Sequence, residues 1–514
     1  MVSGSRTDGE LRRVIGMWDA LALVVGLIIG SGIFRAPASV ALHLPSAALM
    51  MAAWTVGGIL SLAGGLAAAE LGVRFPRSGG QYVFLREAFG PSVAFAFGLT
   101  TVAISKPSIL AGIATVFGIY ASGLVGAPPA AQKILAASAI AALTFVNCLG
   151  VKSGTRTQNA FTLVKTAGLA LLGVAAIASG RGDLRHFLSP GAAGSAAAAG
   201  SAGLAAAAHS LPVALALGLV TILYTYDGWI DVTYTAGEVV EPQRVLPRAI
   251  VAGTLVCTGL YLAANAAYLY LLEPAEIPRY ENVAAVAFGR AFGPAGGTAL
   301  ALLVVVSTLG ILNGSILTGV RVPYAMGRDG TLFRFLGRVH PRSLSPVNAL
   351  VAQGAFACLV VLFAKGFDEI ASLFVSTTWF FYAVSFIGLL VIQWRERRDL
   401  GVRGGWREGR EGQEARRSSL APPGAENVDP APRAAGPTED PASPARRANA
   451  AFRMPLSPLP AVLFILVTLF IIGSDLVFSG PRVLTGMAIV LAGVPLHRVV
   501  AGLNRRRLPR AAPD

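Results

Sequence analysis

The chain has few charged residues, and this scarcity excludes an ordinary soluble protein. Only 13% of its 514 residues are Asp, Glu, Lys or Arg, whereas 54% are hydrophobic. Soluble proteins carry about 25% charged residues. The hydrophobic residues gather in runs of roughly 20, the length that crosses a lipid bilayer as a helix. The sequence therefore predicts an all-α polytopic membrane protein that contacts a lipid bilayer.

Cysteine and histidine are also scarce. The three cysteines, Cys148, Cys257 and Cys358, lie in or at the ends of hydrophobic runs, and the five histidines are scattered. No pair of cysteines has the spacing of a metal site, and the pattern gives no disulfide framework. We therefore expect no metal and no cofactor.

Acidic residues are outnumbered by basic ones, 27 against 42, which gives a net charge of +15. Such an excess can indicate nucleic-acid binding, but the basic residues here do not form one patch. They fall in alternate loops between the hydrophobic runs, which is the positive-inside pattern. We expect no nucleic-acid partner, and we place both termini in the cytoplasm.

About twelve membrane spans are predicted. They cover residues 17–37, 45–72, 91–124, 134–149, 159–178, 211–236, 247–272, 297–326, 348–364, 370–394, 458–478 and 482–500. This gives a cytoplasmic N-terminus (1–16), a core of ten spans (17–394), a cytoplasmic loop (395–456), two further spans (457–500) and a cytoplasmic tail (501–514). Residues 400–453 have few large hydrophobic side chains, so we expect this part of the loop to be disordered. Residues 189–208 are mostly Ala, Gly and Ser and predict a loose external loop.

The first span contains Gly30, Ser31 and Gly32 near its middle. Glycine weakens a helix interior by about 1 kcal/mol relative to alanine. A helix opened here would expose backbone groups at membrane depth, which is tolerated where they line a cavity. Broken helices of this kind form midplane substrate sites in secondary transporters. The alternative is a close helix–helix contact through small residues.

The sixth span places Asp227, Gly228 and Asp231 within the membrane. A buried acid there costs about 2.5 to 3.5 kcal/mol on insertion scales, which makes Asp227 a functional candidate. The alternatives for Asp227 are a helix cap or a partner for a basic residue, and a local hydrogen bond or cap is favoured for Asp231. Because Asp227 and Asp231 are four residues apart and share a helix face, a metal-binding pair in a membrane enzyme is a rival interpretation.

Lys165 lies in the fifth span. A lysine at that depth can act as a proton site, or its fixed charge can replace a bound cation. The alternative is that its side chain reaches the cytoplasmic surface. Lys106 is interpreted as an interior polar contact, and Glu70 is expected at the membrane interface.

Four stretches together resemble one known family, the amino acid–polyamine–organocation superfamily, and within it the L-type amino acid transporters. They are residues 26–34 (GLIIGSGIF), residues 75–91 (FPRSGGQYVFLREAFGP), residues 226–229 (YDGW) with Glu238, Pro242 and 246–250 (LPRAI), and residues 321–330 (RVPYAMGRDG). The resemblance covers nearly the whole chain except residues 400–453. It implies an inverted repeat of five plus five helices, with helices one and six broken, followed by two C-terminal helices.

The resemblance also implies roles for individual residues. Amides around Ser31, Gly32 and Ile33 would bind the carboxylate of an amino acid, and carbonyls near Ile28, Ile29, Tyr224, Thr225 and Asp227 would receive its ammonium group. Tyr224 would be an aromatic gate, Asn313 a further pocket residue, and Lys165 the group that replaces a sodium ion. Animal members carry a disulfide-linked glycoprotein partner through a cysteine in the external loop between spans three and four. Residues 125–131 have no cysteine, so no disulfide-linked ancillary subunit is expected.

These observations predict a sodium-independent amino acid transporter, either an exchanger or a proton-coupled one, rather than an enzyme. A non-transporting amino acid sensor on the same scaffold is the alternative. We expect a multi-pass protein of a plasma (inner) membrane, and the bias toward Ala, Gly and Arg points to a bacterium. Asp227 stands where many members have a small residue, which leaves open a preference for cationic or small polar substrates.

Overall fold

The computed structural model describes residues 11–188, 211–280, 282–363, 378–398, 452–479 and 495. Helices form nearly all of the regular structure in these residues, and the β-type contact among them is an isolated bridge between Ile15 and Val239. The expected external loop (189–208), most of the expected cytoplasmic loop (395–456) and nearly all of the twelfth span (482–500) lie outside the described residues.

Seven of the described helices are long and apolar enough to cross a membrane, and a bent pair adds an eighth. The pair is α1 (Met17–Ile28) and α2 (Gly32–His43), which meet at an angle of 44°. The others are α3 (Ala47–Arg74), the run from Pro91 to Val125, α7 (Ala131–Cys148), α8 (Val151–Ala178), α11 (Pro242–Leu271), the run from Pro294 to Arg328, and the helix Thr378–Arg398. Shorter apolar helices are α10 (Leu211–Thr225), α12 (Val283–Phe292), α15 (Val347–Phe363) and α18 (Leu459–Ser479). The predicted polytopic all-α fold is confirmed.

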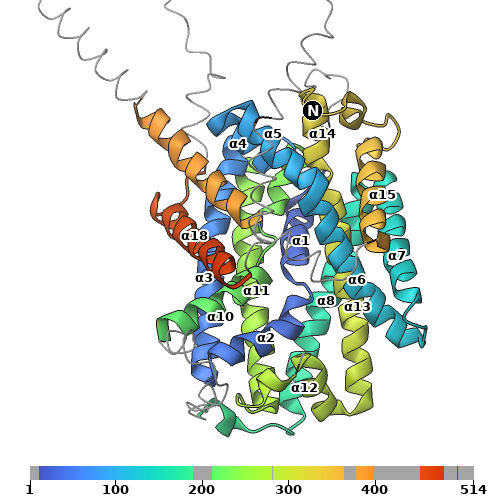
Figure 1. Ribbon diagram of the computed structural model, residues 1–514, viewed down its shortest axis with the longest axis vertical. Coiled ribbons are helices and arrows are strands. Elements are labelled where there is room, and N and C mark those ends of the chain that lie inside the picture. The colour runs from blue at the N-terminus through green and yellow to red at the C-terminus, as the bar shows by residue number, and fades with distance from the viewer. Residues whose placement is uncertain are drawn as a thin grey trace, which may run out of the picture.

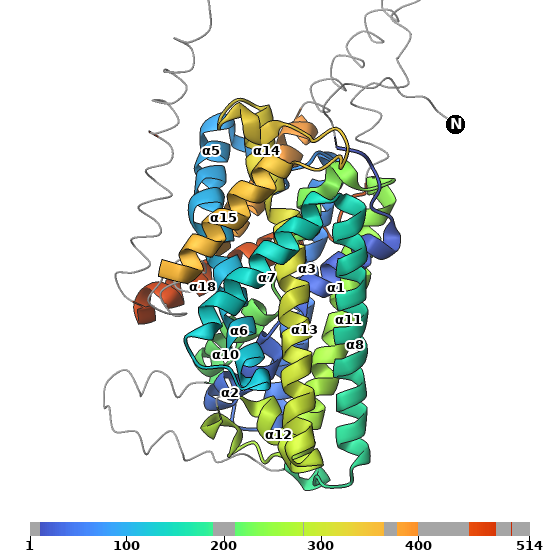
Figure 2. The same ribbon diagram turned by 90° about the vertical axis from the view of Figure 1, so that its right-hand side faces the viewer.

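The helices pack as a bundle around the first span. Helix α1 packs against α11, α8 and α13, while α3 packs along α11. Helix α13 (Pro294–Gly319) also packs against α6 (Lys106–Val125), and Figure 2 shows the long helices α8, α11 and α13 side by side. Helices α4 (Gln81–Phe89) and α14 (Arg321–Arg328) lie at one end of the bundle, and α12 lies at the opposite end (Figure 1).

The third span is one continuous run with a local irregularity. Helix α5 (Pro91–Thr100) passes into a π-helical turn, η1 (Thr101–Ser105), before α6 begins at Lys106. Pro107 follows at once, and a proline removes one backbone hydrogen bond and crowds the carbonyl four residues earlier. A π-helical turn at that place relieves the crowding, and such turns are frequent at functional sites.

The first and sixth spans are both broken, as predicted. Helix α1 ends at Ile28 and α2 begins at Gly32; α10 ends at Thr225 and a 3₁₀ helix, η4 (Asp231–Glu238), follows. The two breaks meet backbone to backbone at Gly228, whose φ is +125°. A β-carbon at this position would lie 2.8 Å from both the carbonyl carbon and oxygen of Leu27. Only glycine fits a close approach in this left-handed region.

The fifth span begins earlier than predicted, at Val151 rather than near residue 159. The polar residues 152–158 continue the helix instead of forming a loop. Lys165 therefore lies at the middle of α8, and its side chain is fully buried. The alternative that Lys165 reaches the membrane surface is excluded by this burial.

Glu70, which was expected at the membrane interface, is fully buried within the protein. Its carboxylate accepts hydrogen bonds from the guanidinium of Arg74 at 2.6 Å, the amide of Gln393 at 2.8 Å and the backbone N–H of Met454 at 2.9 Å. These donors come from α3, from the helix Thr378–Arg398 and from the segment that leads into α18. One carboxylate thus joins three segments that are far apart in the sequence.

Candidate functional site

A cavity lies between the two broken spans. It has about 1190 Å³ of empty space, including its open mouth. The lining comes from the breaks of spans one and six, from η1 and α6, and from the start of the helix Thr378–Arg398. The charged side chains that line it are those of Lys106, Asp227 and Asp231.

The N-terminus of α2 faces this cavity through Ser31 and Gly32. The first N–H groups of a helix have no partner within the helix, and together with the helix dipole they favour an anion. No side chain caps this end of α2. A β-carbon at position 32 would lie 3.0 Å from Cγ2 and 3.1 Å from Oγ1 of Thr225, so the two breaks are in close contact here. The arrangement suits the carboxylate of a small ligand.

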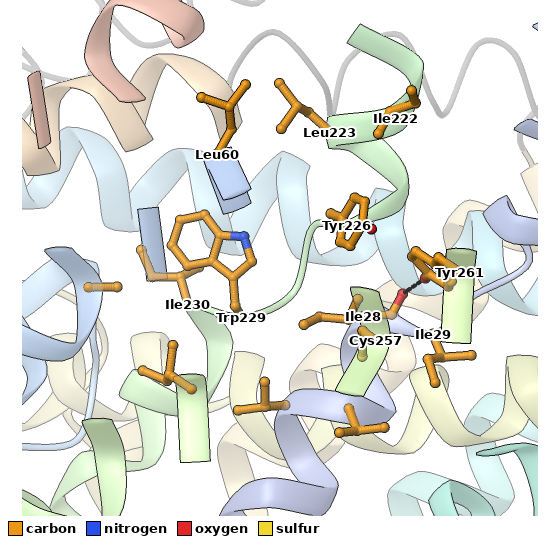
Figure 3. Packing of buried hydrophobic residues seen from close by; sticks show 14 of the residues in the cluster. Ile28, Ile29, Leu60, Ile222, Leu223, Tyr226, Trp229, Ile230, Cys257 and Tyr261 are labelled. Carbon is orange, nitrogen blue, oxygen red and sulfur yellow. Dashed lines mark hydrogen bonds between the residues drawn. The ribbon is translucent and has the colours of Figure 1, made fainter. Parts of the chain in front are cut away.

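Tyr261 on α11 ties the two breaks together. Its hydroxyl lies 2.8 Å from the carbonyl oxygen of Ile28 and 3.1 Å from that of Thr225. Figure 3 shows the bond to Ile28 and the irregular backbone that follows Tyr226. Tyr261 is fully buried, and its ring packs edge-on against those of Trp54 and Tyr226. The hydroxyl thus lies within hydrogen-bonding distance of one backbone carbonyl from each break.

Asp227, in the break of span six, lines the cavity. One oxygen accepts a hydrogen bond of 2.7 Å from the hydroxyl of Tyr382 on the helix Thr378–Arg398. Within the described residues, no basic side chain forms an ion pair with it. Tyr224, which also lines the cavity, is 42% exposed. A cationic group in the cavity would find Asp227 available.

Lys165 lies behind the break of span one, outside the cavity lining. Its ammonium group donates hydrogen bonds to the carbonyl oxygens of Gly26 and Ile29, the latter at 2.8 Å. The hydroxyl of Ser307 on α13 donates to the same Ile29 carbonyl at 3.2 Å. A positive charge therefore sits where unwound carbonyls gather, which is the environment that a bound cation requires.

A second buried cation, Lys106, pairs with Asp231. Its Nζ lies 2.7 Å from Oδ2 of Asp231 and 5.1 Å from the centre of the Tyr234 ring. Asp231 and Asp227 thus have different partners: the ammonium group of Lys106 bonds to Asp231, and the hydroxyl of Tyr382 bonds to Asp227. No group of three His, Cys, Asp or Glu side chains in the described parts of the chain could hold a metal ion.

The structure brings most of the predicted site residues to the cavity. Ile28, Ser31, Gly32, Tyr224, Thr225 and Asp227 line it. Ile29 and Ile33 are buried beside it, and the Ile29 carbonyl already accepts the two bonds that its lone pairs allow. Asn313 lies elsewhere: its amide bonds to Asn147, Gly154 and Gln158, and it joins α7, α8 and α13.

Three features of the site were missed from the sequence. They are the hydroxyl of Tyr261, the hydroxyl of Tyr382 and the ion pair between Lys106 and Asp231. The tyrosines lie in ordinary hydrophobic runs, where an aromatic residue gives no functional signal. The charged pair did carry a signal, because each partner lies within a span, but their sequence separation of 125 residues hid the contact.

Comparison with known proteins agrees with this geometry. A family model described as amino acid permease matches residues 15–473. The b(0,+)-type amino acid transporter 1 of Mus musculus is 33% identical over 396 residues, which cover 76% of this chain and 78% of the relative. The serine/threonine exchanger SteT of Bacillus subtilis (strain 168) is 30% identical over 393 residues, covering 76% and 85%. Large neutral amino acids transporter small subunit 2 of Mus musculus is 32% identical over 405 residues, covering 75% and 71%.

The family match spans both broken helices, the cavity between them and the helices that carry Lys165 and Tyr382. The relatives are transporters and exchangers of amino acids rather than enzymes. The chain is therefore a multi-pass membrane transporter and belongs to the amino acid permease family of the amino acid–polyamine–organocation superfamily.

Proposed function

We propose that the protein is a sodium-independent exchanger of neutral and cationic amino acids in a bacterial plasma membrane. The observation that carries this proposal is the buried ammonium group of Lys165, which is hydrogen-bonded to the Gly26 and Ile29 carbonyls of the first break. It supplies there the charge that a sodium ion would otherwise bring. One relative is named as a serine/threonine exchanger, which favours exchange.

The substrate would bind through the groups common to all amino acids. Its carboxylate would meet the free amides at the N-terminus of α2, near Ser31, Gly32 and Ile33. Its ammonium group would meet the carbonyls near Ile28, Ile29, Tyr224, Thr225 and Asp227. Of these carbonyls, that of Ile29 is filled by Lys165 and Ser307, so we place more weight on the span-six side.

Asp227 would select substrates by the charge of their side chains. Its carboxylate lies in the cavity lining with a neutral hydrogen-bond donor, Tyr382, as its partner. An acidic side chain would be repelled there, whereas a neutral or cationic one would be accepted. Tyr224 lines the same cavity and would close over the substrate as a gate.

Transport would follow alternating access around this midplane site. The two breaks contact each other through Gly228 and Leu27, and through Gly32 and Thr225, so a change at one break reaches the other. Both termini would lie in the cytoplasm. A disulfide-linked subunit is not part of the proposal, because the turn between α6 and α7 has no cysteine.

The same lysine also supports a second coupling mode, proton symport. If Lys165 released its proton during the cycle, the carrier would be a proton symporter. The deciding experiment is uptake of labelled amino acids into proteoliposomes in sodium-free buffer, with and without internal amino acid and with and without a proton gradient. Exchange requires internal amino acid; uptake driven by the gradient alone means symport.

Two results would overturn the proposal. Uptake that requires sodium would contradict the proposal that the ammonium group of Lys165 replaces a sodium ion. Binding of amino acids without any flux, under all four conditions, would instead identify a sensor on the transporter scaffold.

A further inference from the structure

The cavity contains a charged pair that the proposed function does not use. Lys106, the first residue of α6, and Asp231, the first residue of η4, both line the cavity. Their side chains are 6% and 12% exposed, and the Nζ–Oδ2 distance is 2.7 Å. The hydroxyl of Thr318 on α13 also donates to Oδ2 of Asp231, at 3.3 Å.

The position of Lys106 is built by the backbone. The π-helical turn η1 ends at Ser105, directly before it, and Pro107 follows. The ammonium group lies 5.1 Å from the centre of the Tyr234 ring, a distance at which a cation is attracted to an aromatic face. The ammonium group of Lys106 is therefore held at the cavity wall by Asp231, by the Tyr234 ring and by the irregular helix that carries it.

The pair decides how many free charges face a ligand. The cavity lining holds two carboxylates, Asp227 and Asp231, and one ammonium group, Lys106. Lys106 neutralises Asp231, which leaves Asp227 as the carboxylate without an ion-pair partner among the described residues. Removing either member of a buried pair leaves an uncompensated charge in a medium of low dielectric constant. That charge would act directly on a bound substrate.

We propose that the ion pair between Lys106 and Asp231 is a specificity-determining element. It leaves the substrate cavity with one unpaired carboxylate, that of Asp227. The inference rests on the proposed function, because it concerns the charge of the amino acids that the cavity accepts. The pair acts by masking Asp231, so its loss changes selectivity in a direction that depends on which partner is removed.

The test measures kcat/KM for L-arginine and for the best neutral amino acid in proteoliposomes loaded with internal amino acid. Lys106→Met frees Asp231 and should raise the arginine-to-neutral ratio about tenfold. Asp231→Asn frees Lys106 and should lower that ratio about tenfold. The double variant Lys106→Met/Asp231→Asn removes both charges and should return the ratio to that of the unaltered protein.

A second buried ion pair provides the matched control. Arg321 and Glu238 form two hydrogen bonds of 2.7 Å, are at most 1% exposed and do not line the cavity. Removing one charge of this pair, with Arg321→Met or Glu238→Gln, should lower uptake of both substrates in the same proportion, because the charge left unpaired lies outside the cavity lining. Size-exclusion chromatography of each variant shows whether it folds.

The outcomes separate the two proposals. If the unaltered protein transports no amino acid, the proposed function fails. If it transports, but the Lys106 and Asp231 variants lower both substrates equally or shift the ratio in the same direction, the pair is structural and the inference is wrong. If one single variant does not fold, the double variant is compared with the remaining single variant. The inference requires that their arginine-to-neutral ratios differ.

Discussion

The hydroxyl of Tyr261 lies 2.8 Å from the carbonyl oxygen of Ile28, the last residue of α1 before its break. The same hydroxyl lies 3.1 Å from the Thr225 carbonyl, where α10 ends. One O–H group can donate to one carbonyl at a time. Tyr261 is therefore placed to exchange its bond between the two breaks as they move relative to each other.

Replacing Tyr261 by Phe should slow transport. The substitution leaves a buried carbonyl without a donor, at a cost of about 1–3 kcal/mol. If that cost falls on the transport cycle, the rate drops about 10- to 100-fold. The measurement is the initial rate of exchange per inserted molecule. Tyr268→Phe is the control: Tyr268 is also buried on α11, and its hydroxyl has no hydrogen-bond partner among the described residues. A similar loss in both variants would assign the effect to packing.

Lys165→Met should reduce transport by about tenfold or more, because the carbonyls of Gly26 and Ile29 lose a charged donor. Uptake would be followed across a series of pH values, with and without a proton gradient. Lys152→Met is the matched variant, since Lys152 lies on the same helix but is exposed. Unchanged uptake and an unchanged pH response in Lys165→Met would reduce Lys165 to a structural role.

Gly32→Leu should abolish uptake while the protein still inserts in the membrane. A β-carbon at position 32 already lies 3.0 Å from the Thr225 side chain, so a longer side chain must displace the break or enter the cavity. Gly123→Leu is the comparison, because a β-carbon at Gly123 on α6 meets nothing within 4 Å. Normal transport by Gly32→Leu would refute binding at the N-terminus of α2.

Gly228→Ala should destabilise the protein, by about 1–3 kcal/mol from backbone strain alone. Its φ of +125° is unfavourable for alanine, and the new methyl group would lie 2.8 Å from the Leu27 backbone. Thermal melting of the purified protein in detergent measures the loss. Gly259→Ala, where nothing lies within 4 Å, should melt at the same temperature or higher, since alanine favours a helix by about 1 kcal/mol. Equal melting temperatures for the two variants would show that the breaks do not need this contact.

The helix breaks could be predicted from the sequence because their signals are local. Gly30, Ser31 and Gly32, and likewise Asp227 with Gly228, are polar or small residues in the middle of hydrophobic runs. The depth of Lys165 followed from its position in a span, and the structure places it there. Local composition thus predicted the two helix breaks that border the candidate site, since opened backbone needs residues that tolerate it.

The partners across the site could not be predicted in the same way. Lys106 and Asp231 each had a plausible local interpretation, and only the fold brings their side chains together. Asn313 shows the converse. It is a polar residue within a span, but its face of α13 turns toward α7 and α8, where Asn147 and Gln158 satisfy its amide. A single sequence does not specify which face of a buried helix meets the cavity.

Glu70 holds both ends of the stretch between Gln393 and Met454. Gln393 and Met454 both donate to this carboxylate, so the stretch between them starts and ends at one point of the protein. The entropy of closing a loop grows slowly with its length, by about 0.6 kcal/mol for each doubling. Changes in length between residues 398 and 452 should therefore be tolerated, and the region offers a place to fuse a reporter domain without disturbing the described helices.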